Sequence, residues 1–554
     1  MARDTVSPNE MTAGEAIVRS LIANGVDTVF GLPGAQTYPL FGALERYADR
    51  VQTFGVRHEQ AAAYMALGYA KATGRPGVYT VVPGPGMLNT TAALSTAWAT
   101  NAPVLCVTGQ IPSRYLDKRR GALHEIPDQL ATLRGLTKWA ARIERAEDAP
   151  AVLNEAFRIM LSGRPGPVAV EMSWDRLAQR GAVEIGAPAV PDMPPLPEMH
   201  AVARAAALLA NAERPLILLG GGAQHAAEDV RALVERLGAP VAAFRSGRGI
   251  VAEDHPLSVS SYAASQLWKD TDLLLGIGSR LEMPYARWAD MMEAVTVAPK
   301  HPPLVRIDID PEEMTRLVPE IGIVADAAEG ARALLEALSA YQPKARSRER
   351  IEHVRDEAAR RVAAAVKPHA DYLAAIRDVL PRDGFFVEEL CQAGFASYFA
   401  FPVYQPRTYV TPGFQGTLGF GFPTALGVKA AHPERAVVSI SGDGGFMFGM
   451  QDLATAVERN LGVVAIVFNN SSFGNVRRDL KRLYNGNALG AEFRNPDFAK
   501  LADAFGAGFY RANDPADLKP KLADAIARNM PAIIEVPVDP DTEASPWPFI
   551  HTNM

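Results

Sequence analysis

Residues 441–470 read SGDGGFMFGMQDLATAVERNLGVVAIVFNN. The Gly-Asp-Gly at 442–444 follows an apolar run at 436–440, and the paired asparagines at 469–470 follow a second apolar run at 463–468. Apolar residues at helical spacing lie between the two runs. The pattern predicts a strand, a turn, a helix and a second strand parallel to the first, which together form one βαβ unit.

The polar residues of this unit stand where a ligand is expected. Asp443 follows the first predicted strand and Asn470 follows the second. Parallel strands bring their carboxyl ends to one edge of the sheet, where the ligand crevice of such sheets lies. Two oxygen ligands and a backbone carbonyl suit Mg²⁺, and the helix after Gly444 offers its N–H groups to a phosphate. The alternative is an ordinary βαβ unit with polar loop ends.

Length and composition bound the class of protein. A chain of 554 residues suggests three or four domains, and 48% apolar and 21% charged residues are ordinary for a globular protein. A formal charge of −6, with no basic run, argues against a nucleic-acid partner. The two cysteines, Cys106 and Cys391, have no metal-binding spacing and indicate buried thiols in a reducing compartment. We find no signal peptide and no bilayer-spanning stretch, and therefore expect a cytoplasmic protein without a membrane partner.

Two linkers divide the chain. Residues 186–198 are rich in proline, and residues 344–361 are highly charged and predict a solvated helix. We therefore expect three domains, at residues 1–185, 199–343 and 365–554. In each of them short apolar runs alternate with helical patterns, which predicts three α/β domains with doubly wound parallel sheets. The predicted strands are 26–31, 77–82, 103–108, 215–219, 272–277, 304–308 and 532–537, and helices are expected at 12–22 and 59–73.

Two further segments have a chemical pattern. In residues 55–74 Glu59 begins an alanine-rich helix that ends in Thr-Gly. A glutamate in a first helical turn is commonly a residue that compensates the helix dipole. Residues 412–427 are glycine-rich and apolar and lead into a helix, and glycine at these positions also permits a close-packed loop.

These three segments, in this order, resemble those of thiamine-diphosphate enzymes of the acetolactate-synthase-like family. The resemblance covers nearly the full length of the chain. Further motifs support it, namely Phe30–Gly34, Pro83–Asn89, Ala102–Gly109 and Leu136–Trp139. It implies a pyrimidine-binding domain, a central Rossmann-like domain and a diphosphate-binding domain, with thiamine diphosphate and Mg²⁺ as cofactors.

The resemblance assigns the cofactor site. Asp443, Asn470 and the main-chain carbonyl of Ser472 would hold the metal. Leu418 would separate the two rings of the cofactor, and the Gly416 carbonyl would meet its exocyclic amine. The cofactor-binding set that the family implies is Pro33, Glu59, Gly84, Asn89, Gly394, Gly416, Leu418, Gly442, Asp443, Gly444, Gly445, Asn470, Ser472, Phe473, Gly474, Asn475 and Val476. In this family the two halves of one site come from different subunits, which implies a homodimer or homotetramer.

The chemistry of the cofactor explains the need for Glu59. In the family, a glutamate at this place bonds a ring nitrogen of the aminopyrimidine. That bond favours the imino tautomer, whose nitrogen takes the proton from the reactive C2 carbon of the thiazolium. The protein supplies geometry and a proton relay, and the cofactor supplies the electron sink.

The chain departs from true acetolactate synthases at two substrate positions. In those enzymes an arginine meets the second 2-oxo acid, and its place falls at about Pro284 in this chain. They also carry a tryptophan beyond the paired asparagines, and its place falls near Asp479. Arg477 and Arg478 lie close to this second place and are candidates for binding a substrate carboxylate. The alternative is that they are exposed helix charges.

Two polar residues of the first domain complete the candidate set. His124 aligns with a glutamine that reaches the active site in relatives, and a histidine there is suited to proton transfer near neutral pH. Gln36 stands where some carboligases and lyases place a catalytic polar group. A single histidine is also commonly structural.

The central domain gives a weak nucleotide signal. Glycines at 220–222 follow a predicted strand, as in a dinucleotide-binding turn. Some relatives hold FAD or ADP in this domain. Residues 258–262 lack the stretch that touches flavin in acetolactate synthases, so FAD is not favoured.

The sequence thus predicts a thiamine-diphosphate- and Mg²⁺-dependent enzyme that makes or cleaves the C–C bond next to the carbonyl of a 2-oxo acid or related substrate, such as an aldehyde. A carboligase or lyase is the first choice and a 2-oxo acid decarboxylase the second. A 2-hydroxyacyl-CoA lyase or an enzyme like oxalyl-CoA decarboxylase is the third. An inactive scaffold or regulatory subunit is the non-enzymatic alternative.

Overall fold

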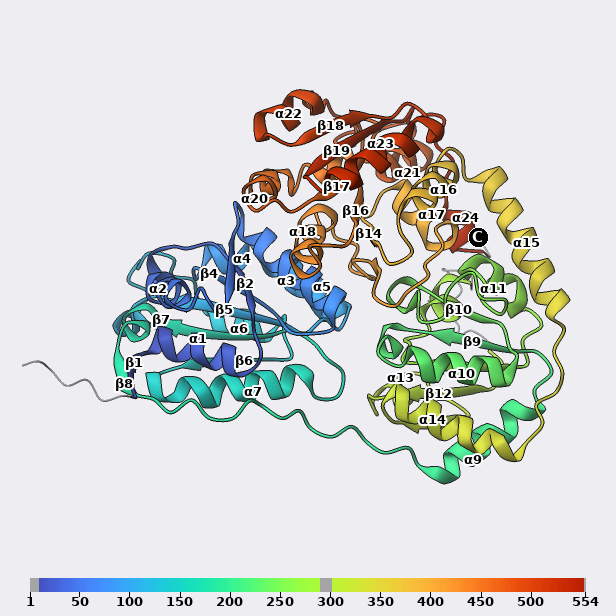
Figure 1. The fold of residues 1–554 in the computed structure, drawn as a ribbon, viewed down its shortest axis with the longest axis horizontal. Helices are drawn as coiled ribbons and strands as arrows, with labels where there is room; N and C mark the ends of the chain where they lie inside the picture. The colour runs from blue at the N-terminus through green and yellow to red at the C-terminus, as the bar shows by residue number, and fades with distance from the viewer. Residues whose placement is uncertain (1–8, 289–300, 553–554) are drawn as a thin grey trace, which may run out of the picture. The chain divides into compact units, whose positions relative to one another are not determined.

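The computed structural model describes residues 9–288 and 301–552. Its backbone contacts divide the chain into two units. The first unit holds the described residues up to 193 together with 414–433 and 449–461, and the second holds the remaining ones. Three parallel sheets and one two-stranded antiparallel pair form the framework (Figure 1).

The first unit contains a six-stranded parallel sheet with the order β3-β2-β4-β5-β7-β6. Its strands are β2 (Thr28–Gly31), β3 (Gln52–Gly55), β4 (Gly77–Val81), β5 (Val104–Gln110), β6 (Trp139–Ile143) and β7 (Val168–Ser173). Its longer helices are α1 (Ala13–Ala23), α2 (Tyr38–Arg46), α3 (Glu59–Thr73), α5 (Thr91–Ala99) and α7 (Ala149–Leu161). The order reverses between β2 and β4, so the ligand crevice of this sheet is expected at their carboxyl ends.

Helix α3 is confirmed with the predicted bounds. It starts at Glu59 after His58, whose imidazole accepts the Gln60 N–H, and it ends at Gly74, whose φ of 75° only glycine adopts easily. Small residues on α3 let a second helix, α18 (Gly421–Ala431), approach closely. A Cβ added at Gly427 would lie 1.9 Å from the Met65 carbonyl oxygen, so contact here is between backbones.

The second unit contains the central sheet, ordered β10-β9-β11-β12-β13. Its strands are β9 (Pro215–Leu219), β10 (Val241–Ala243), β11 (Leu273–Ile277), β12 (Leu304–Asp308) and β13 (Ile321–Val324). Its helices include α9 (Met199–Asn211), α10 (Ala227–Leu237), α11 (Ser261–Trp268) and α14 (Ala327–Ala337). The strands predicted at 215–219 and 304–308 are confirmed, and the predicted charged helix is α15 (Arg348–Ala365), which begins four residues later than expected.

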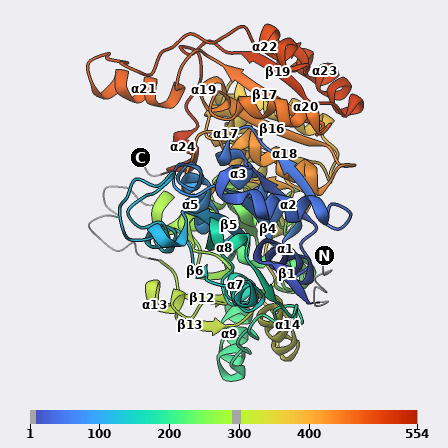
Figure 2. The same cartoon turned by 90° about the vertical axis from the view of Figure 1, so that its left-hand side faces the viewer.

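The same unit contains the third sheet, ordered β15-β14-β16-β17-β19-β18. Its strands are β14 (Phe385–Val387), β15 (Tyr409–Val410), β16 (Val437–Gly442), β17 (Val463–Asn469), β18 (Gly508–Arg511) and β19 (Ala532–Pro537). Helices α16 (His369–Val379), α17 (Gln392–Ala400), α22 (Phe498–Phe505) and α23 (Pro515–Arg528) belong to it. Helix α22 contacts β18 and β19, and α23 contacts β17 and β19 (Figure 2). The strand order repeats that of the first sheet, so the equivalent reversal lies between β14 and β16.

The βαβ prediction for residues 441–470 is right in its strands and incomplete in its helix. Strands β16 and β17 are parallel and adjacent, with Gly442 opposite Phe468. Between them the chain forms three short helical pieces, α19 (Asp443–Phe446), η8 (Met450–Asp452) and α20 (Leu453–Glu458). The glycines at 444, 445 and 449 explain the interruption, because glycine is a poor helix former.

The C-terminal segment packs against the central and third sheets, which share one apolar core. In α24 (Trp547–Ile550) and beyond, Phe549 contacts Tyr262 with ring centroids 4.7 Å apart, and the Arg287 guanidinium lies 3.1 Å from His551 Nε2. Burial, followed by the charge of Arg287, lowers the pKa of His551 to about 4. The ring is therefore neutral at pH 7 and can accept from the guanidinium.

Other sequence predictions have mixed outcomes. The linker at 186–198 contains no helix or strand, as expected. The antiparallel pair of β1 (Glu10–Thr12) and β8 (Arg180–Ala182) was not predicted. Residues 1–8, which carry part of the signal-peptide argument, lie outside the described residues. Among the helices that the structure describes, none is long and apolar enough to cross a membrane.

Candidate active site

Asp443 and Asn469 lie side by side at the carboxyl edge of the third sheet. Strand β16 ends just before Asp443 and its neighbour β17 ends at Asn469. Asn495, from the loop before α22, connects the two: its Nδ2 atom lies 2.6 Å from Asp443 Oδ2 and 2.9 Å from Asn469 Oδ1. The Gly444 N–H donates to Asp443 Oδ1 at 3.0 Å. The aspartate is therefore held on both oxygens.

The side chain of Asn470 is held by three hydrogen bonds. Its Nδ2 atom donates to Glu543 Oε2 at 2.7 Å, and its Oδ1 atom accepts from both the N–H and the hydroxyl of Ser472, each at 3.0 Å. The amide oxygen thus faces Ser472, the third predicted metal contact. The structure brings the three predicted metal residues to the carboxyl edge of the third sheet.

The electrostatics of this edge favour a bound cation. Asp443 is fully buried. Burial is the main cause that raises the pKa of its carboxyl, and the hydrogen bonds from Asn495 and Gly444 oppose it. The donors are a carboxylate, an amide oxygen and a backbone carbonyl, which are hard oxygen ligands without sulfur or nitrogen. The residues present fit Mg²⁺.

Residues after strand β14 lie on the other side of the switch point between β14 and β16, close to the end of β16. Gly394 lies in the first turn of α17, where a Cβ would be 1.9 Å from the Glu389 carbonyl oxygen. A Cβ at Gly442 would lie 3.3 Å from Cys391 Cβ, so the loop after β14 lies against the end of β16. Glu388, at the end of β14, is fully buried and accepts from the Thr411 hydroxyl at 2.6 Å.

The segment after Asn470 contains the remaining predicted residues of this edge. Gly445 is buried within α19, and a Cβ at Gly444 would lie 2.4 Å from the Phe473 ring. Helix α21 (Gly474–Leu483) begins next, and its Val476 is half exposed.

The two candidate arginines of α21 differ in their partners. Arg477 is almost buried, and its guanidinium pairs with Glu492 at 2.7 Å and Asp541 at 2.8 Å. Arg478 is less engaged with charge, because it donates to the Asn475 side chain, which also accepts from the Trp547 indole. The structure therefore favours Arg478 over Arg477 as a group available to a substrate.

In the first unit, Glu59 stands at the start of α3, after the carboxyl end of β3. Asn89 Nδ2 donates to Glu59 Oε2 at 3.0 Å, so two residues of the predicted cofactor-binding set are in contact. The other oxygen, Oε1, has no hydrogen bond within the part of the chain that the structure describes. A Cβ at Gly86 would lie 3.5 Å from this oxygen and 2.5 Å from Val82 Cγ2, which explains the glycine.

Gln36 and His124 meet at the switch point between β2 and β4. Gln36 is buried, its Oε1 atom lies 3.0 Å from His124 Nδ1, and its Nε2 atom donates to the Leu123 carbonyl. Gly84 adopts a φ of 59°, and a Cβ there would lie 2.2 Å from the His124 carbonyl oxygen. Pro33 is exposed in the loop before Gln36.

A buried polar network supports the loop that carries Gly84. Gln129 Oε1 accepts the Gly84 N–H at 2.8 Å, and its Nε2 donates to Glu171 Oε2 at 2.9 Å. Arg142 donates to the other oxygen of Glu171 at 2.7 Å, which compensates the buried charge. Sequence reasoning missed this network, because its members come from α6 (Gln129–Arg134), β6 and β7.

The loop with Gly416 and Leu418 is fixed within the first unit. Gly416 has a φ of 61°, which favours glycine, and Leu418 is partly exposed. The hydroxyls of Thr417 and Thr96 are 2.9 Å apart and connect the loop to α5.

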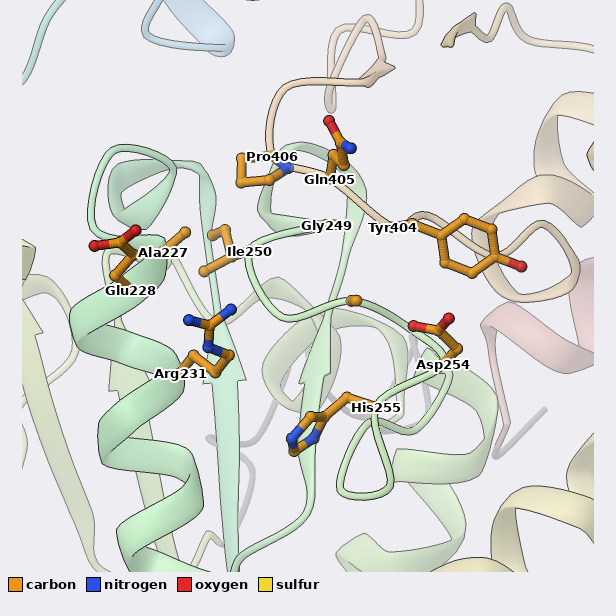
Figure 3. A pocket seen from close by; sticks show the side chains of 11 residues that line it. Ala227, Glu228, Arg231, Gly249, Ile250, Asp254, His255, Tyr404, Gln405 and Pro406 are labelled. Atoms are coloured by element: carbon orange, nitrogen blue, oxygen red, sulfur yellow. The ribbon is translucent and has the colours of Figure 1, made fainter. Parts of the chain in front are cut away.

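The central sheet has a pocket of about 440 Å³ (Figure 3). Helix α10 contributes Arg231, the loop after β10 contributes His255, and residues 404–406 form the opposite side. The glycine triplet does not line this pocket. A Cβ at Gly220 would lie 2.1 Å from the Gly278 carbonyl oxygen, so the triplet serves close backbone packing. That FAD or ADP is possible but not favoured in this domain stays a prediction.

Comparison with protein families identifies the family of this chain. Three models match the chain: the N-terminal domain of thiamine pyrophosphate enzymes at residues 11–132, their central domain at 202–334 and their C-terminal domain at 391–536. The chain belongs to the thiamine pyrophosphate enzyme family. Its predicted order of pyrimidine, central and diphosphate domains is confirmed. It is a carboligase or decarboxylase that depends on thiamine pyrophosphate, which is also called thiamine diphosphate.

Individual relatives of this thiamine pyrophosphate enzyme have two kinds of activity in their names. A probable 2-ketoarginine decarboxylase of Pseudomonas aeruginosa is 34% identical over 95% of this chain and 94% of its own length. A probable acetolactate synthase large subunit of Methanocaldococcus jannaschii is 34% identical over 97% of this chain and 93% of its own. The large subunit of acetolactate synthase isozyme 1 of Escherichia coli is 30% identical over 98% and 96%.

Two residues at the carboxyl edge of the third sheet in this thiamine pyrophosphate enzyme escaped sequence reasoning. Asn495 precedes Pro496 in a loop, and Glu543 lies in the C-terminal tail. Neither follows a strand of the motif, so no local spacing pointed to them. Their polar character in otherwise unremarkable segments was the only available signal.

Proposed function

We propose that this enzyme uses thiamine diphosphate and Mg²⁺ to make or cleave the C–C bond next to the carbonyl of a 2-oxo acid. The cluster of Asp443, Asn470 and Ser472 is the observation that carries the proposal. It offers oxygen donors from the ends of two adjacent parallel strands, β16 and β17, at the carboxyl edge of the third sheet, beside the switch point between β14 and β16. These residues would hold Mg²⁺ between the protein and the diphosphate.

Glu59 is proposed as the residue that bonds the aminopyrimidine. Asn89 occupies one carboxylate oxygen at 3.0 Å, which fixes the direction of the other. Glu59 would hold and pass a proton through that second oxygen. When bound, thiamine diphosphate supplies a nucleophilic carbon and an electron sink.

The roles at the substrate end are also proposals. Gln36 and His124 form one hydrogen-bonded pair, so they would orient a substrate or move a proton together. Arg478 is proposed to bind the substrate carboxylate, because Arg477 is already neutralised by two acidic partners. The assembly is proposed to be a homodimer or homotetramer, as the family resemblance implies.

A carboligase or lyase remains the first candidate and a 2-oxo acid decarboxylase the second. The relative named as a 2-ketoarginine decarboxylase and a relative named as an acetolactate synthase are equally similar, which supports both. The places where acetolactate synthases carry an arginine and a tryptophan fall at about Pro284 and near Asp479, which weakens the case for acetolactate formation itself. Retention of Glu59, Asp443 and Asn470 argues against an inactive scaffold.

Product analysis separates these candidates. The purified protein, with thiamine diphosphate and Mg²⁺, is incubated with pyruvate, glyoxylate, benzoylformate or 2-ketoarginine, each with and without an aldehyde. Mass spectrometry that finds the shortened aldehyde and CO₂ identifies a decarboxylase, and a longer hydroxyketone product identifies a carboligase. An Asp443→Ala variant serves as the blank. Absence of thiamine diphosphate binding by calorimetry would contradict the proposal.

A further inference from the structure

Glu543 has an unusual position for a residue of the C-terminal segment. Its side chain is 4% exposed, and its Oε2 atom accepts from Asn470 Nδ2 at 2.7 Å. Its Oε1 atom lies 3.1 Å from Nε2 of His369, which is completely buried. The next residue, Ala544, donates its N–H to the Lys367 carbonyl and so fixes the segment beside α16.

This contact determines which way the Asn470 amide points. An asparagine side chain has one acceptor oxygen and one donor NH₂ group on opposite sides of a planar amide. Because the NH₂ group is bound by Glu543, the oxygen must face the Ser472 side, where it accepts from the N–H and the hydroxyl. An asparagine binds Mg²⁺ through its oxygen, so the ion would be bound from this side of the amide.

The local backbone is adapted to the same contact. A Cβ at Gly474 would lie 2.7 Å from Asn470 Nδ2 and 3.2 Å from Glu543 Oε2. Glycine therefore leaves room for the carboxylate to reach the amide. Glu543 also adds an acidic group beside Asn470, in addition to Asp443.

We propose that Glu543 is a positioning residue that orients Asn470 for metal binding, an inference that rests on the function proposed above. It acts through Asn470 and does not itself touch the metal. Partners that bind the ligands of a metal commonly change its affinity about 10- to 100-fold when they are removed. The effect belongs to cofactor loading and is separate from the chemical step.

Calorimetry of the full-length protein tests the proposal. Binding of Mg²⁺ in the presence of saturating thiamine diphosphate is measured for the wild type, Glu543→Ala, Glu543→Gln and the control Glu329→Gln. The side chain of Glu329, in α14, is 44% exposed. We expect Glu543→Ala to weaken Mg²⁺ binding about 10- to 100-fold. Glu543→Gln should weaken it less, because the glutamine oxygen can still accept from Asn470. The control should bind as the wild type does.

A double-mutant cycle with Asn470→Ala keeps the test valid if Glu543→Ala is less stable. The two substitutions should be non-additive in Mg²⁺ affinity, since Glu543 acts through Asn470. Additive effects, or unchanged affinity in both Glu543 variants, would overturn the positioning role alone. A wild type that takes up neither Mg²⁺ nor thiamine diphosphate would instead overturn the proposed function.

Discussion

The Nδ2 atom of Asn495 lies 2.6 Å from Oδ2 of Asp443, although the two residues are 52 positions apart. The same nitrogen contacts Asn469, so one amide holds the ends of β16 and β17, beside which the proposed metal site lies. The contact keeps the Asp443 carboxylate in a single orientation.

Removal of this amide should therefore weaken cofactor binding. We expect Asn495→Ala to lower the affinity for Mg²⁺ and thiamine diphosphate about tenfold or more, with a smaller effect on the rate of the loaded enzyme. Calorimetry and activity at saturating cofactor measure the two effects. Asn513→Ala, at an exposed position, is the control. Equal affinities in all three proteins would show that Asn495 is not needed.

Loss of the Glu59 carboxylate, which is proposed to bond the aminopyrimidine, should affect turnover instead of cofactor binding. We expect Glu59→Gln to lower kcat by at least about 10²-fold, since a proton-transferring group typically contributes 10²–10⁴. Folding should be intact, because the helix start at His58 is unchanged. Steady-state kinetics and circular dichroism check this, with the exposed Glu45→Gln as control. Activity at the wild-type level would disprove the assigned proton relay.

The close approach of α3 and α18 predicts a stability effect. A Cβ at Gly427 would lie 1.9 Å from a backbone oxygen, which cannot rotate away, so Gly427→Ala should destabilise the protein by about 1–3 kcal/mol or more. Gly42→Ala in α2 meets no atom within 4 Å and should be neutral or slightly stabilising. Urea unfolding compares the two, and similar midpoints would argue against the tight helix contact.

The buried Glu388 predicts a pH effect on stability. Burial raises the pKa of its carboxyl to about 7, while Thr411 and then Arg245 act in the opposite direction. Between about pH 4.5 and 7 the folded state therefore binds more protons than the unfolded state, so this group lowers the free energy of unfolding as pH rises.

Replacement of Glu388 by glutamine should remove that dependence. We expect the Tm of Glu388→Gln, relative to that of the wild type, to increase as the pH rises from 5 to 8. Thermal unfolding across this range measures the difference, and the exposed Glu336→Gln should follow the wild type. Parallel curves for Glu388→Gln and the wild type would mean that Glu388 does not titrate in this window.

Sequence reasoning succeeded where a local pattern determines position. The strands around Asp443 and Asn470 are adjacent and parallel, so the motif spacing alone brought these residues together. Gln36 and His124 were each predicted, but their contact spans 88 positions and depends on how two loops fold. Asn495 and Glu543 lie in irregular segments without periodicity, so no pattern could place them. Packing of distant segments, rather than propensity, decides such contacts.

The docking of the segment from Glu543 to His551 has a genetic consequence. A stop codon just before residue 543 would spare every strand of the third sheet. It would nevertheless delete the partner of Asn470, the indole that contacts Asn475 and the imidazole that meets Arg287. Nonsense variants that stop the chain just before residue 543 should thus behave as loss-of-function alleles.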